Sequence, residues 1–163
     1  SVLCSAWKKL PDVPLVIMGA GPQENMLKQF IKTHPDLQIK YLGYVPHDEC
    51  QGIMGNAEFV LLPSICYEGC SMTVIEAFSL GKPVIATDIG FMHEAISAVG
   101  MNTVFPMKDY NALSHKVMEL WNDPDLCSQS GKIARNEYEN KYSESIDIAN
   151  LMKIYYDCIG ENS

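Results

Sequence analysis

The chain has 163 residues, 47% of them hydrophobic, which is enough for one substantial core and a single domain. Its formal net charge is −8 and it contains no basic run, which argues against nucleic acid or an anionic membrane as its main partner. It contains no run of about 18 apolar residues, so no segment is expected to span a bilayer.

Short apolar strands alternate with helices along the chain. This alternation implies an α/β fold: a Rossmann-like parallel sheet with helices on both faces. The expected elements, in chain order, are helix 3–10, strand 15–18, helix 23–33, strand 39–42, helix 47–55, strand 59–62, helix 73–80, strands 83–87 and 103–105, helix 111–122, and helix 124–158 with a break at 142–143.

The last part of the chain is expected to form a separate helix. Ser143 follows the break and suits an N-cap position. The sequence therefore predicts a C-terminal helix at about 143–158, packed at the edge of the domain.

The first loop with a ligand-binding pattern contains Gly19 and Gly21, between a strand and a helix. The dinucleotide fingerprint needs a third small residue where this chain has Glu24, which excludes a nicotinamide or flavin site. Contact of these glycines with another ligand and a purely structural tight turn both remain open. In open parallel sheets, ligands bind beyond the carboxyl ends of the strands, where this loop and the loops at 43–45 and 68–69 fall.

The segment from residue 67 to residue 77 carries the densest functional pattern. Glu68 and Glu76 flank a turn of small residues. Residues 69–72 offer successive backbone N–H groups at the start of a helix, an arrangement that attracts phosphate or an oxygen-rich ligand. Glu68 could reach that ligand from the loop, and Glu76 could accept hydrogen bonds from a pair of its hydroxyls. Taken alone, Glu76 is more often a helix-capping acid, and Glu68 a solvated turn acid.

The helix in this segment has predictable ends. Thr73 and Glu76 fit a capping box, with Thr73 as the N-cap and Glu76 as the third helical residue. Gly81 suits a left-handed stop, and Pro83 follows it. Lys82, between them, is expected to be solvated.

Six cysteines are scattered at irregular spacings, which favours reduced thiols over a disulfide framework. Cys66 and Cys70 have the wrong spacing for the usual zinc knuckle and lack a second ligand pair. We expect neither a metal nor a cofactor.

Several motifs together resemble the donor-site region of family 4 (group 1) retaining glycosyltransferases, which have the GT-B fold and a signature of Glu, seven residues, Glu. The resemblance covers residues from about 6 to 142. It is carried by the segments at 15–22, 42–45, 62–64, 67–69, 74–77, 81–88 and 90–96.

The resemblance implies roles for individual residues. Glu68 would be the catalytic acid in contact with the transferred sugar of a nucleotide-sugar donor, and Glu76 would hold the ribose hydroxyls. The base would meet Tyr44 and Val45, largely through backbone groups. Retention of the anomeric configuration and the absence of a divalent metal are implied as well. The backbone amides implied to meet the sugar and the diphosphate are those of Gly69, Cys70, Ser71, Met72 and Thr73.

The chain departs from the family pattern in two ways. Cys70 and Ser71 stand where the family usually has Phe-Gly or Phe-Pro. The family's diphosphate-binding cations lie upstream of a helix that resembles residues 3–10, where this sequence starts without an initiator Met. We therefore expect a fragment: one donor-binding domain over 1–163, without its first strand, those cations and the acceptor-binding N-terminal domain. Such a fragment would bind donors poorly or form a homodimer through an exposed sheet edge, and would not transfer sugar alone.

Two other functions stay open. A sugar-nucleotide epimerase-like GT-B domain would use similar nucleotide contacts but different acids, so Glu68 and Glu76 favour the transferase. A non-catalytic flavodoxin-like regulatory module would need an acidic cluster after its first strand, which residues 18–20 do not provide. By analogy with polysaccharide-building members, the expected location is cytoplasmic or peripheral at the inner membrane face.

Overall fold

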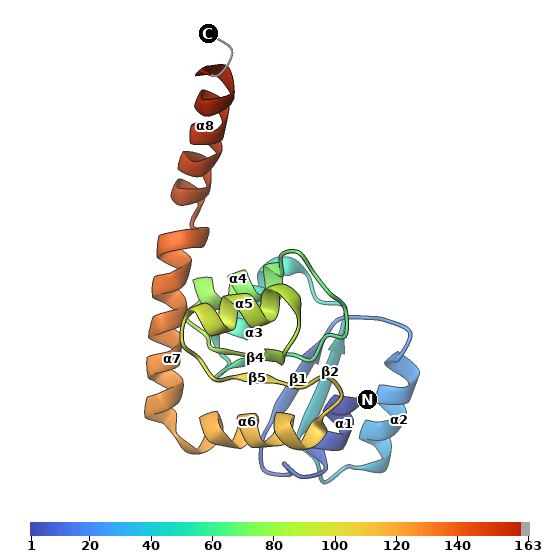
Figure 1. Cartoon of the computed structure of the whole chain (residues 1–163). Helices are drawn as coiled ribbons and strands as arrows, with labels where there is room; N and C mark the ends of the chain where they lie inside the picture. Colours follow the sequence, from blue (N-terminus) through green and yellow to red (C-terminus); the bar gives the residue numbers. More distant parts are fainter. Residues whose placement is uncertain (161–163) are drawn as a thin grey trace.

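The computed structural model describes residues 1–160 and contains parallel strands flanked by helices (Figure 1), which confirms the predicted fold class. The elements are α1 (Val2–Trp7), β1 (Leu15–Met18), α2 (Glu24–Thr33), β2 (Ile39–Gly43), α3 (His47–Gly55), β3 (Val60–Leu62), α4 (Met72–Ser79), β4 (Val84–Thr87), α5 (Gly90–Ala98), β5 (Val104–Phe105), α6 (Tyr110–Asn122), α7 (Pro124–Glu137), the π-helix η1 (Tyr138–Tyr142) and α8 (Glu144–Gly160).

The strands form two parallel sheets, not the single sheet that the sequence predicts. β1 pairs with β2, and the second sheet has the order β3-β4-β5. Within residues 1–160, no backbone pairing joins β1 to β3. The alternation of strands and helices predicts parallel pairing correctly, but it carries no information about which neighbours share hydrogen bonds.

A hydrophobic core spans the break between the two sheets. One buried cluster joins Trp7 of α1 and Leu15 of β1 to Ile85 of β4, Phe105 of β5 and Leu113 of α6. A second cluster lies between α4, β4 and α5. All four residues of β4 are buried, as expected for the central strand of a sheet that is covered on both faces.

The start of α4 differs from the prediction, and its end agrees with it. Ser71 is the N-cap, without a side-chain capping bond, so the capping box with Thr73 as N-cap is wrong. The carbonyl of Ser71 instead accepts two N–H groups of the first turn. Gly81 has φ +65° and ends the helix, because its N–H and that of Lys82 donate to carbonyls inside the helix.

Helix α5 was not anticipated from the sequence. Its N-cap is Ile89, which makes no side-chain capping bond, and its first residue is Gly90 with φ +48°. A helix that starts without a polar N-cap residue leaves no pattern in the sequence from which its start could be predicted. The helix is held by burial of Met92, Ala95 and Ile96 against the sheet.

The C-terminal helices agree with the prediction in their break and differ in their packing. Ser143 is extended and interrupts the helix, but its hydroxyl donates to the carbonyl of Glu139 instead of capping α8. Helix α8 projects away from the body of the protein (Figure 1), and none of its residues is buried. The expectation that it packs at the domain edge is therefore wrong. No helix within residues 1–160 is long and apolar enough to cross a membrane.

Candidate functional site

The loops that follow β1 and β2 are tied together. The N–H of Gly19 donates to the carbonyl of Gly43 at 2.7 Å, and the hydroxyl of Tyr41 donates to the carbonyl of Gly19 at 2.8 Å. Gly19 and Gly21 are exposed and line a cavity of about 380 Å³. The positive φ of Gly19, +116°, explains the glycine at that position.

The segment proposed to meet the base lies next to this loop. Tyr44 is 79% exposed and Val45 is half-buried, directly after β2. Helix α3 begins two residues later at His47, with Pro46 as its N-cap. The side chain of Tyr44 is therefore open to a ligand or a partner.

The acid-bearing loop presents its backbone at the amino end of α4. Glu68, Gly69, Cys70 and Met72 are exposed, whereas Ser71 is only 2% exposed and its side chain faces the interior. Within the described part of the chain, no protein acceptor satisfies the N–H groups from Gly69 to Thr73. These N–H groups and the positive end of the helix dipole can therefore bind an anionic or oxygen-rich ligand.

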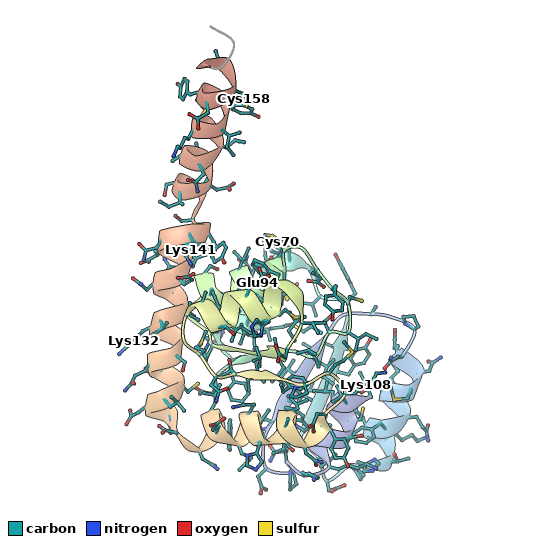
Figure 2. All side chains as sticks on the ribbon, in the orientation of Figure 1. Cys70, Glu94, Lys108, Lys132, Lys141 and Cys158 are labelled. Carbon is teal, nitrogen blue, oxygen red and sulfur yellow. The ribbon has the colours of Figure 1, made fainter. Side chains whose placement is uncertain are left out.

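Helix α5 approaches the same loop. A Cβ on Gly90 would lie 3.4 Å from the carbonyl oxygen of Glu68 and 3.5 Å from the ring of Tyr67, so a glycine permits this approach. Figure 2 labels Cys70 on the loop and Glu94 on α5, both on the side of the body from which α8 rises. Burial, and then the charge of Glu137, raise the pKa of the Tyr142 hydroxyl, and Cys70 and Glu94 add smaller rises.

Glu76 on α4 points toward α3. It therefore links the loop that carries Glu68 to the segment that follows β2. Its carboxylate Oε1 lies 3.8 Å from Nδ1 of His47, and its side chain is 23% exposed. Cys50 lies on α3, as His47 does. Burial, and then the negative charge of Glu76, raise the pKa of its thiol. The sequence places His47 on the surface but does not pair it with Glu76, because the two residues lie on different helices, 29 positions apart in the sequence (76 − 47).

A second carboxylate–histidine pair lies at the same edge. Asp88 directly follows β4, and its Oδ1 contacts Nδ1 of His93 in the first turns of α5. Both side chains remain about half exposed. The position of Asp88 after a buried strand is a signal that could have placed it at this edge; the partner could not be inferred without α5.

Glu68 and Glu76 lie outside the two best-formed cavities of residues 1–160, neither of which they line. The same residues contain no group of three or more His, Cys, Asp or Glu side chains that could hold a metal ion. Cys4, Cys50, Cys66, Cys70 and Cys127 are free thiols, and Cys66 and Cys70 are exposed.

Residues 1–137 match the family model described as glycosyl transferases group 1. The chain belongs to this family. Among its relatives is the phosphatidyl-myo-inositol mannosyltransferase of Mycolicibacterium smegmatis, which is 25% identical over 162 residues, covering 95% of this chain and 40% of the relative. The chain spans about two fifths of the length of the first curated relatives it matches.

Solved structures agree with the fold of the group 1 domain. The sucrose-phosphate synthase of Thermosynechococcus elongatus superposes with a TM-score of 0.83 at 22% identity, over 99% of this chain and 42% of that one. The C-terminal domain of a group 1 glycosyl transferase from Francisella tularensis gives 0.73 at 23% identity, over 88% of this chain and 76% of that domain. The architecture is that of the C-terminal domain of a GT-B glycosyltransferase.

Proposed function

We propose that this group 1 domain binds the nucleotide-sugar donor of a glycosyltransferase that retains the anomeric configuration. The observation that carries the proposal is the run of backbone N–H groups from Gly69 to Thr73. No protein acceptor within residues 1–160 satisfies these N–H groups, which lie at the amino end of α4 between Glu68 and Glu76. A diphosphate would supply the missing acceptors, and its negative charge would suit the helix dipole.

In this proposal each part of the donor meets one segment. Glu68 contacts the transferred sugar, the amides hold the diphosphate, and Glu76 accepts hydrogen bonds from the ribose hydroxyls. Tyr44 and Val45 meet the base. The domain then acts by positioning the donor and stabilising the charge of the leaving diphosphate, without a metal or a cofactor.

The acceptor is proposed to bind a second domain of a longer enzyme. The break between β1 and β3 supports this, because each of these strands has one edge without a backbone partner within residues 1–160, and such an edge can accept an extended segment from the rest of such an enzyme. A second copy of the chain is the alternative occupant. We propose that the domain alone does not transfer sugar, and that the whole enzyme works in the cytoplasm or at the inner membrane face.

The test is a thermal-shift screen with UDP, GDP, ADP and their sugars. One nucleotide is expected to raise the melting temperature of the parent chain, since a ligand at 100 times its Kd stabilises by about 2.7 kcal/mol. Glu76→Ala should lose this rise, whereas Glu144→Ala on the exposed α8 should keep it. If no nucleotide stabilises the parent, or if Glu76→Ala responds as the parent does, the donor-site assignment is wrong.

The same screen examines the pairing of His47 with Glu76. His47→Gln removes the imidazole that faces the carboxylate. We expect nucleotide affinity to fall about twofold to fivefold, because exposed pairs of this kind contribute about 0.5–1 kcal/mol. His115→Gln on α6 is the matched control. Equal affinities of the two variants would show that His47 does not hold Glu76 in its binding position.

The epimerase-like alternative makes a different prediction about the products. A domain of that kind would convert the sugar of a bound nucleotide-sugar to its epimer without an acceptor. Chromatography of each donor after incubation with the chain separates the two proposals, since a transferase donor domain leaves the sugar configuration unchanged.

A further inference from the structure

A second cavity, of about 500 Å³, lies between α7 and the turn that joins α4 to β4. Lys82 and Pro83 form part of its wall and directly precede β4, whereas the proposed donor loops follow the carboxyl ends of the strands. A four-residue strand spans about 13 Å, so the two regions lie beyond opposite ends of the strands. This basic cavity is separate from the proposed donor site.

Cations are concentrated at the basic cavity. Lys82, Lys132 and Arg135, three of the 12 Lys and Arg residues of the chain, line it. Neither lysine makes an ion pair within residues 1–160. Lys82 is half-buried, and Lys132 is exposed on α7, where Figure 2 labels it. Its flexible stem lets the ammonium group turn toward a ligand.

Arg135 is held in place by two hydrogen bonds. Its Nε donates to Oε1 of Glu139 at 2.8 Å, and its Nη1 donates to the carbonyl of Ser79. A guanidinium has five N–H donors, so three remain for a ligand. The turn that faces it is also rigid, because Gly81 closes the end of α4 by backbone hydrogen bonds.

The remaining polar side chains of the basic cavity can form hydrogen bonds with hydroxyl groups of a ligand. Glu58, Ser128 and Asn136 line the cavity, and the Glu139 carboxylate is already used by Arg135. Burial, and then the charge of Glu58, raise the pKa of the Cys127 thiol, while Lys82 opposes the rise. The thiol is therefore neutral and adds no negative charge to the lining.

We propose that the basic cavity binds a small phosphate monoester that also carries hydroxyl groups. The two lysines and the fixed guanidinium surround the phosphate, which offers at least three acceptor oxygens, and Glu58, Ser128 and Asn136 contact the hydroxyls. The amino end of α7 at Pro124 contributes the positive end of its dipole. Because the whole chain is acidic, its overall field repels anions, and a local group of cations such as this one is needed to offset that repulsion.

The test is an amide NMR titration of the full chain with inorganic phosphate, glycerol 3-phosphate and glycerol at constant ionic strength. We expect saturable shifts at Gly81, Lys82, Ser128 and Lys132 with both phosphates, tighter with glycerol 3-phosphate, and no shifts with glycerol. The double variant Lys82→Gln/Lys132→Gln should bind at least tenfold more weakly. Shifts that grow linearly without saturation, or that map elsewhere, would overturn the proposal.

Two controls separate this site from bulk charge and from the donor site. Lys32→Gln/Lys40→Gln changes the net charge equally at exposed positions outside the cavity and should bind as the parent does. Glu76→Ala should also keep phosphate binding, so a failure of the donor proposal leaves this one intact. Equal losses in the two lysine double variants would show that overall charge, and not the cavity, causes the effect. A thermal melt of each variant checks that it is folded.

Discussion

Replacing Gly131 with alanine is expected to lower the free energy of unfolding by about 3 kcal/mol, at the upper end of the cost of overpacking a core. Gly131 is buried on α7, and an added Cβ would lie under 3.0 Å from the carbonyl oxygen of Gly81 and 3.3 Å from its carbonyl carbon. The Gly81 backbone cannot move away easily, because it closes α4 with φ +65°. Urea unfolding followed by circular dichroism measures the change.

Gly52→Ala is the matched control for Gly131→Ala. Gly52 also lies inside a helix, but a Cβ there meets nothing within 4 Å. The substitution should therefore stabilise the chain by about 0.5–1 kcal/mol through helix propensity. If Gly131→Ala were as stable as the parent, the described packing of α7 against the turn after α4 would be wrong.

Trp7→Ala should cost about 3–5 kcal/mol, the usual range for deleting a buried aromatic side chain. Trp7 is 1% exposed in the cluster that joins β1 to β4 and β5, and its indole N–H donates to the carbonyl of Val13 at 2.9 Å. Trp7→Phe keeps most of the apolar area and leaves the Val13 carbonyl without its donor, so it should cost about 1–3 kcal/mol. Guanidinium unfolding of both variants separates packing from hydrogen bonding.

Trp121, the other tryptophan, provides the comparison for Trp7. It lies on α6 and is 36% exposed, so Trp121→Ala should cost about 1 kcal/mol. A loss at Trp121 as large as that at Trp7 would mean that the core is not centred where the structure places it. Trp7→Phe as stable as the parent would show that the bond to Val13 contributes nothing.

Strands and helix ends with a local signal were predictable from the sequence. The apolar run that becomes β4 is buried, whereas β1 forms as predicted but buries only Leu15 and leaves Val16 exposed. Gly81 stops α4 as a glycine in the left-handed region should. The capping box at Thr73 failed because a backbone turn at Ser71 starts the helix two residues earlier. Helix α5 was missed because its amino end has no polar cap.

The loops of the candidate site were predictable as well, since each follows a predicted strand. Their mutual arrangement was not. The contact of His47 with Glu76 and that of Asp88 with His93 depend on where α3 and α5 lie. Residue types do not determine which strands share backbone hydrogen bonds, so the break between the two sheets could not be predicted from the sequence.

The projecting helix α8 gives the domain a lever. Its 17 residues form a rod about 25 Å long that follows the π-helical turn Tyr138–Tyr142, where Tyr142 packs edge-to-face against Phe91 of α5. A rotation of about 10° at that turn would move the far tip by about 4 Å. A small adjustment beside the loop that carries Cys70 would thus be amplified at a distance from it.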